Sequence, residues 1–386
     1  MRNIKTIGID NKRLLIRVDF NVPLENGSIL DDSRIKTALP TIRYALEKKC
    51  RCVLMTHLGR PKGEVVPELK LDSVASRLSE LLNVNVKKCN KVVGHEAEAM
   101  ADNLKDGEIM LLENLRFDPG EKSCDEDFAA KLASMGEVYI NDAFAACHRK
   151  HASMFAVPKH FQPDSRAIGF LIQKEIDALN KVRNSPKHPF VAIFGGIKVS
   201  DKIGTIHALI NRVDRLLIGG AMSYAFMKAR GHDVGSSEVE EGALDLAGKI
   251  IKEAGDKLVL PVDHVVSDDS EEIREIVDEE IKGNRKGMDI GPKTISLYQK
   301  EIDNANTVLW NGPMGKYENR FFAEGTAKIA EFLADSDAIT LVGGGETGGF
   351  VRSQNMQDKM THVSTGGGAF LYFMAHGTLP ALDVLE

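Results

Sequence analysis

The chain has 386 residues, of which 43% are hydrophobic and 27% are charged, and its formal net charge at pH 7 is -6. The length predicts two or three domains of about 150 residues each, and the composition excludes a largely disordered chain. The negative charge argues against a general nucleic-acid or membrane binder, because those partners require a basic surface.

Five cysteines lie in the first 150 residues. Cys50 and Cys52 are one residue apart, which is not zinc-ligand spacing, so we expect free thiols in a reducing compartment. The opening residues MRNIKTIGID contain no apolar signal stretch, and no run of about 18 apolar residues occurs in the chain. We therefore expect a cytoplasmic protein.

Short runs rich in Val, Ile and Leu recur along the chain at intervals too long for hairpins. Apolar runs without alternation are typical of strands buried on both faces of a parallel sheet. The predicted strands are Leu14–Phe20, Cys52–Thr56, Ile109–Glu113, Val138–Asn141, Phe190–Phe194, Arg215–Ile218, Lys257–Val262, Thr307–Trp310, Ile339–Val342 and His362–Ser364. Helix-like stretches such as Leu71–Leu82, Glu126–Met135 and Gly325–Ala334 lie between them. The alternation predicts an α/β fold with parallel sheets.

The segment Ile168–Val182 is the best candidate for a helix between two domains. Its apolar residues at 168, 171, 172, 176 and 179 follow helical spacing, and Asn184-Ser185-Pro186 ends the pattern. The polar, acidic segment Ser267–Asn284 is expected to be exposed.

Charged residues follow the predicted strands of the first half. They include Asp19–Asn21 with Arg34, His57–Arg60, Glu113–Arg116, and Asn141-Asp142 with His148–His151. Ligands bind at the carboxyl ends of strands in parallel sheets, and arginine forks match the oxygens of carboxylates and phosphates. Any one of these arginines could be a solvated surface residue. Four at successive strand ends predict a site for a small, multiply anionic substrate.

Glycines follow the predicted strands of the second half, in the stretches 195–196, 219–220, 312–315, 343–349 and 366–368. Glycine lets backbone N–H groups approach phosphate closely, and a helix N-terminus favours anions. Lys198 and Lys202 are four residues apart, so they would face the same way if a helix began there. These features indicate a nucleotide site.

Glu346 lies in one of these glycine-rich stretches and is a candidate ligand for Mg²⁺ on nucleotide phosphates. Alternatively, its carboxylate only favours the dipole of a helix N-terminus. The P-loop pattern, the dinucleotide fingerprint GxGxxG and the protein-kinase HRD and DFG signatures are absent.

Eight motifs, in order along the chain, resemble those of the phosphoglycerate kinase family. They are Arg17–Leu24 (RVDFNVPL), Thr56–Gly63 (THLGRPKG), Glu113–Phe117 (ENLRF), Asn141–Ser153 (NDAFAACHRKHAS), Gly195–Ile203 (GGIKVSDKI), Leu309–Glu318 (LWNGPMGKYE), Gly343–Thr347 (GGGET) and His362–Ala369 (HVSTGGGA).

The resemblance implies two Rossmann-like, three-layer domains with parallel sheets. Their expected bounds are 1–167 plus about 370–386 for the substrate domain, 168–183 for a connecting helix, and 184–369 for the nucleotide domain. The implied reaction is reversible transfer of the acyl phosphate of 1,3-bisphosphoglycerate to Mg-ADP, giving 3-phosphoglycerate and ATP. Because the two sites would lie on different domains, we expect them to close together by hinge motion. No coiled-coil or apolar stripe in the sequence argues for an oligomer, so we expect a monomer.

The resemblance also implies site residues. The substrate set is Asp19, Phe20, Asn21, Arg34, His57, Leu58, Gly59, Arg60, Arg116 and Arg149. The nucleotide set is Lys198, Lys202, Gly287, Asn311, Glu318, Gly344, Gly345, Glu346 and Thr347. Arg34 and Lys198 are the expected catalytic residues.

The chain departs from the family pattern at several of these motifs. Glu346 stands where the family usually has Asp, Ala145-Ala146-Cys147 replaces Gly-Thr-Ala, and Lys316 replaces an apolar residue. Gly348 and Gly349 weaken the start of the helix that follows.

Two alternatives come from other functional classes. A nicotinamide-dependent dehydrogenase would share glycine-rich turns on a parallel sheet, but it requires GxGxxG and a ribose-binding acid about 20 residues later. A scaffold protein that has kept the fold would not need the full charged set, which is present: Arg34, Lys198, Lys202, Glu318 and Glu346.

Overall fold

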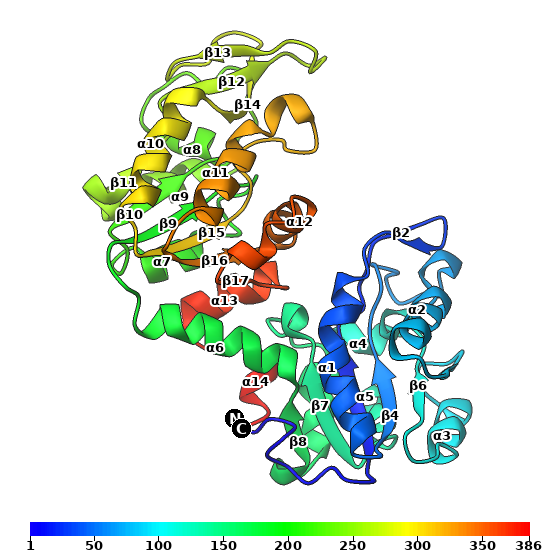
Figure 1. Ribbon diagram of the computed structural model, residues 1–386. Coiled ribbons are helices and arrows are strands. Elements are labelled where there is room, and N and C mark those ends of the chain that lie inside the picture. Colours follow the sequence, from blue (N-terminus) through cyan, green and yellow to red (C-terminus); the bar gives the residue numbers. More distant parts are fainter. The chain divides into compact units, whose positions relative to one another are not determined.

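The computed structural model describes residues 1–386, which form two compact units. Residues 1–177 and 378–386 make unit 1, and residues 178–377 make unit 2. Helix α6 (Phe170–Asn184) carries the chain from the first unit into the second (Figure 1). The division falls within this helix, whereas the sequence placed the domain bounds at its two ends. None of the helices combines the length and apolarity that a bilayer span requires.

Unit 1 contains a six-stranded sheet with the order β5-β6-β4-β1-β7-β8, in which every neighbouring pair is parallel. Its strands are β1 (Arg13–Val18), β4 (Arg51–Met55), β5 (Val86–Lys88), β6 (Ile109–Leu111), β7 (Val138–Asp142) and β8 (Arg166–Ile168). Its helices are α1 (Ser33–Glu47), α2 (Asp72–Leu82), α3 (His95–Asp102), α4 (Pro119–Ser123), α5 (Glu126–Ala133) and α14 (Pro380–Asp383). A two-stranded ribbon, β2 (Leu24–Glu25) with β3 (Ser28–Ile29), completes the unit.

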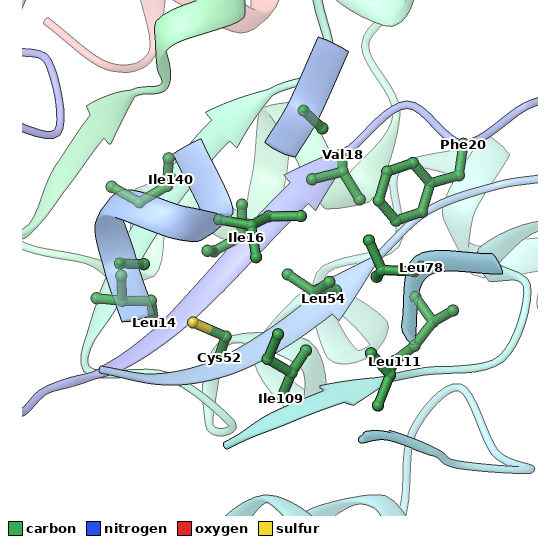
Figure 2. Packing of buried hydrophobic residues seen from close by; sticks show 14 of the residues in the cluster. Leu14, Ile16, Val18, Phe20, Cys52, Leu54, Leu78, Ile109, Leu111 and Ile140 are labelled. Carbon is green, nitrogen blue, oxygen red and sulfur yellow. The ribbon is translucent and has the colours of Figure 1, made fainter. Parts of the chain in front are cut away.

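The core of unit 1 explains why its strands read as unbroken apolar runs. Leu14, Ile16 and Val18 point to one face of β1 and pack with Leu54 and with Leu78 of α2 (Figure 2). The intervening residues of β1 are also buried, so the sheet is covered on both faces. Each such aliphatic side chain contributes about 1.5–3 kcal/mol through burial.

Unit 2 contains a second six-stranded parallel sheet, with the order β11-β10-β9-β15-β16-β17. Its strands are β9 (Phe190–Phe194), β10 (Arg215–Ile218), β11 (Leu258–Val259), β15 (Thr307–Asn311), β16 (Ile339–Gly343) and β17 (His362–Val363). Its helices are α7 (Ile203–Leu209), α8 (Ser223–Ala229), α9 (Ala243–Ala254), α10 (Pro292–Asp303), α11 (Glu324–Ala334), α12 (Gly345–Ser353) and α13 (Gly367–His376). The predicted α/β class with parallel sheets is thus confirmed.

A small antiparallel sheet in unit 2 was not predicted. It has the order β13-β12-β14 and consists of β12 (His264–Ser267), β13 (Glu275–Val277) and β14 (Lys286–Ile290). Strand β13 lies within the polar segment 267–284, which is mostly exposed as expected.

Several predicted element bounds differ from the observed ones, and two of them differ for a clear local reason. The strand predicted over Lys257–Val262 is reduced to β11, because Pro261 has no N–H group to continue a ladder. The helix predicted from Ile168 begins at Phe170. Ile168 itself belongs to β8, where it pairs with Asn141.

Candidate active site

The loops that follow β1, β4, β6 and β7 lie at one edge of unit 1, because these neighbouring strands are parallel. Asp19 follows β1 and is nearly buried. Its Oδ2 accepts a hydrogen bond of 2.5 Å from Nη1 of Arg34, in the first turn of α1. This ion pair holds the Arg34 side chain at the sheet edge.

Hydrogen bonds between the loops fix their mutual positions. Asn21 Oδ1 accepts from the N–H of Gly59 at 2.8 Å, and Arg116 Nη1 donates to the carbonyl of Gly59 at 2.6 Å. Phe20 and Leu58 are buried, so only their backbone groups could touch a ligand. Gly59 has a φ of +62°, a conformation that favours glycine.

The cations at this edge are close enough to perturb one another. Burial, together with the charges of Arg17, Arg149 and Arg60, lowers the pKa of Arg116 to about 10. Burial and the charges of Arg17, Arg116 and Arg34 lower the pKa of His57 well below its usual value. Arg60 and Arg149 are exposed. The structure therefore gathers the predicted substrate cations around one basic surface.

Three buried residues beneath this surface were missing from the predicted site. They are Arg17 on β1, Glu121 on α4 and Ser153, all fully enclosed. One signal was available in the sequence: Arg17 interrupts the apolar run of a strand that is buried on both faces, where a charge requires partners.

In unit 2 the glycine-rich turns lie at the carboxyl ends of β9, β15 and β16. Asn311 ends β15, and its Nδ2 donates to the carbonyl of Gly343 at 2.7 Å. The N–H of Gly312 donates to Thr347 Oγ1 at 2.8 Å. Gly344, with a φ of +115°, precedes α12 as its N-cap residue. Asn311 and Thr347 thus join neighbouring turns of this edge.

A pocket of about 400 Å³ opens within unit 2, and Gly287, Glu318 and Glu346 are among its lining residues. A Cβ atom at Gly287 would lie 2.0 Å from the Tyr224 hydroxyl oxygen, so only glycine fits there. Glu346 is exposed in the first turn of α12. Its charge and that of Asp201 partly offset the burial that lowers the pKa of Lys202.

The condition under which Lys198 and Lys202 would face the same way, a helix that includes both, is not met. Helix α7 begins at Ile203, after Lys198 and Lys202. Lys198 is exposed, whereas Lys202 is nearly buried. The turn between them is held by Ser200, whose N–H donates to Glu240 Oε2 at 3.1 Å.

Two residues that depart from the family pattern, Cys147 and Lys316, contact identifiable side chains. Cys147 is buried, which raises the pKa of its thiol to about 12, and its sulfur accepts from Asn141 Nδ2 at 3.5 Å. Lys316 at the pocket pairs with Glu271 at 2.5 Å. Cys147 therefore acts in packing, while Lys316 places an ion pair at the pocket wall.

Comparisons with known proteins converge on one family. A family model described as phosphoglycerate kinase matches residues 4–376. A curated relative from Dictyoglomus turgidum, named phosphoglycerate kinase, is 48% identical over 98% of this chain and 96% of its own length. A relative of the same name from Clostridium kluyveri is 45% identical over 100% of this chain and 98% of its own.

Solved structures of phosphoglycerate kinases are also similar to this chain. Phosphoglycerate kinase from Pyrococcus horikoshii has a TM-score of 0.89 and 34% identity, covering 100% of this chain and 98% of that one. The enzyme from Coxiella burnetii has a TM-score of 0.84 and 37% identity, covering 99% and 98%.

Proposed function

This chain belongs to the phosphoglycerate kinase family and catalyses phosphoryl transfer between 1,3-bisphosphoglycerate and ADP, and from that premise we propose a role for each unit of the fold. Unit 1 binds the phosphoglycerate, and unit 2 binds the nucleotide. The observation that carries this division is the chemistry of the two sheet edges: arginines gather at one, and glycine-rich turns with Lys202 lie at the other.

In unit 1, we assign the distal phosphate of the substrate to His57, Arg60, Arg116 and Arg149. Arg116 is fixed by the carbonyl of Gly59, so its fork is oriented before the substrate arrives. Arg34 is tied to Asp19 and reaches the carboxyl end of the substrate, where the attacking or leaving oxygen lies. Asn21 and the backbone of residues 20 and 58 shape the loops around it.

In unit 2, the first turn of α12, whose backbone N–H groups have no partner within the helix, supplies donors to the nucleotide phosphates, and Lys202 neutralises their charge. Gly287 and Glu318 line the pocket beside this edge. We assign the nucleoside of the nucleotide to this pocket. Lys198 is exposed on the turn before α7 and follows the equatorial oxygens of the transferring group. No general base is required, because a carboxylate is already an anionic nucleophile.

Glu346 is the proposed Mg²⁺ ligand. The chain forms no cluster of three or more His, Cys, Asp or Glu side chains that could hold a metal by itself. A single exposed carboxylate at a helix N-terminus suits Mg²⁺, which typically takes one or two carboxylates and completes its shell with phosphate oxygens and water. When bound, Mg²⁺ neutralises charge on the nucleotide phosphates.

We also infer that the enzyme acts in the cytoplasm as a monomer. All five cysteines are free, and four of them are buried, which suits a reducing compartment.

A coupled assay with 3-phosphoglycerate and Mg-ATP tests the proposed function, and activity is expected. No turnover with any nucleotide triphosphate would favour a scaffold protein instead.

Arg60→Ala is expected to raise KM for 3-phosphoglycerate about tenfold with little change in kcat, because a hydrogen bond to a charged group contributes about 1.5–3 kcal/mol. Steady-state kinetics measures both constants. Lys122→Ala is the matched control, since Lys122 is an exposed cation close enough to lower the pKa of His151 but lies outside the proposed set. An unchanged KM in Arg60→Ala would remove Arg60 from the phosphate site.

Glu346→Gln is expected to raise the Mg²⁺ concentration needed for half-maximal activity about tenfold, because the amide lacks the carboxylate charge. Glu324→Gln is the control, since Glu324 also lies in the first turn of a helix, α11. If Glu346→Gln lowers the melting temperature but leaves the Mg²⁺ dependence unchanged, Glu346 only favours the helix dipole.

A further inference from the structure

A chain of buried hydrogen bonds runs beneath the basic surface of unit 1. Ser153 Oγ donates to Glu121 Oε1 at 2.7 Å, and the N–H of Ser153 donates to Glu121 Oε2 at 2.9 Å. Because the hydroxyl proton is directed at Glu121, a lone pair of Ser153 Oγ faces Arg17, whose Nε donates to it at 3.0 Å. The carboxylate and the guanidinium are thus connected through one hydroxyl.

Arg17 makes two further hydrogen bonds. Its Nη1 donates to the carbonyl of Val18. Its Nη2 lies 2.9 Å from Nδ1 of His57. A guanidinium has donors only, so Nδ1 must accept this bond. An imidazole whose Nδ1 accepts is neutral and carries its proton on Nε2.

The charges around the ring favour the same state. Burial disfavours the imidazolium form of His57, and so do the cations of Arg17 on β1, Arg116 after β6 and Arg34 on α1, with His151 contributing in the same direction. Glu121 is the fully buried acidic side chain of the cluster, and burial raises its own pKa against the opposing effect of Arg17. Glu121 is connected to Arg17 through the Ser153 hydroxyl and makes no hydrogen bond to His57. Its hydrogen bonds therefore hold the Arg17 side chain in place.

We infer that Arg17 is a positioning residue: anchored to Glu121 through Ser153, it holds His57 as the neutral tautomer protonated on Nε2, which presents a single N–H donor to a substrate phosphate. His57 is buried, but its Nε2 makes no hydrogen bond within the chain and is not among the fully enclosed polar atoms without a partner, which leaves this N–H for a ligand at the surface of the site. This inference rests on the proposed role of His57 in the phosphate site.

The arrangement has a functional consequence. A phosphate monoester loses its second proton near pH 6, and an unrestrained histidine titrates near pH 6.5. A ring that carried charge would therefore lose it in the same range in which the substrate gains charge. Holding the ring neutral removes this opposition, so the pH dependence of binding comes from the substrate alone between about pH 6 and 8.

The test is nitrogen-15 NMR of the histidine rings from pH 5.5 to 8, with His57 assigned by its loss in His57→Gln. In the wild-type protein we expect Nε2 protonated and Nδ1 unprotonated throughout. In Arg17→Met the ring stays buried beside Arg116 and Arg34, so we expect it to remain neutral but to lose its fixed tautomer, with part of the population protonated on Nδ1. We expect KM for 3-phosphoglycerate to rise about tenfold, with kcat changed less than about twofold. Ser153→Ala should shift both in the same direction by less. Ser79→Ala, which removes a structural hydroxyl from α2, should change neither.

A wild-type His57 that is protonated on Nδ1 or charged at pH 7 would overturn the inference, even if Arg17→Met fails to fold. An Arg17→Met variant in which the His57 ring nitrogens are protonated as in the wild type would also overturn the inference. A changed ring state with an unchanged KM would overturn the positioning role. If Arg60→Ala also left KM unchanged, the phosphate site itself would be wrongly placed, which separates the two failures.

Discussion

Replacement of Arg34 by alanine is expected to lower kcat at least a hundredfold. Arg34 is held at the sheet edge by Asp19, and its proposed target is the carboxyl oxygen that attacks or leaves during transfer. A preorganised donor aimed at developing charge contributes on the order of 3–4 kcal/mol to the transition state, which corresponds to roughly a hundredfold or more in rate. Steady-state kinetics with 3-phosphoglycerate and Mg-ATP measures this effect.

The Arg34→Ala variant also leaves the Asp19 carboxylate, only 5% exposed, without its ion-pair partner. Thermal unfolding must therefore accompany the kinetics, so that a loss of folded protein is not counted as a loss of catalysis. Arg34→Lys is the informative companion, because lysine retains the charge but not the planar fork. We expect it to recover part of the rate. A kcat within about threefold of wild type in folded Arg34→Ala would exclude the catalytic role.

Lys198→Ala is expected to lower kcat by a similar factor while KM for either substrate changes little. The side chain is exposed on the turn before α7, so its removal creates no cavity and should leave stability within about 0.5 kcal/mol. A cation that follows the transferring group stabilises charge that is spread over the equatorial oxygens in the transition state. Its loss should therefore appear in kcat rather than in ground-state binding.

Lys252→Ala on α9 is the control for loss of an exposed lysine in unit 2. Near wild-type turnover in Lys198→Ala would show that the lysine does not contact the transferring group. A raised KM for Mg-ATP with unchanged kcat would place Lys198 in nucleotide binding instead.

The strand ends were predictable from the sequence because parallel strands buried on both faces read as unbroken apolar runs. Each run marks where the next residues emerge at the sheet edge, which is how Asp19, His57 and Asn311 could be placed. The small antiparallel sheet was missed because β13 is a three-residue, largely exposed strand inside an acidic segment, and β14 begins with Lys286 and Gly287 rather than with an apolar run.

The buried part of the site could not be predicted from spacing. Arg17 and Ser153 are 136 residues apart, and their contact depends on how β1 and the segment after β7 pack together. The lysines show a similar limit. Four-residue spacing implies a common face only inside a helix, and α7 begins one residue after Lys202.

The most direct test of the division between the two units is isothermal titration calorimetry of two variants with both ligands. The Arg60→Ala/Arg149→Ala double variant removes two exposed cations from unit 1. It should bind 3-phosphoglycerate at least tenfold more weakly and Mg-ADP as the wild type does. Glu346→Gln should bind Mg-ADP at least tenfold more weakly and 3-phosphoglycerate as the wild type does. Unchanged 3-phosphoglycerate affinity in the double variant, or its loss in Glu346→Gln, would contradict the assignment of the substrate to unit 1 and the nucleotide to unit 2.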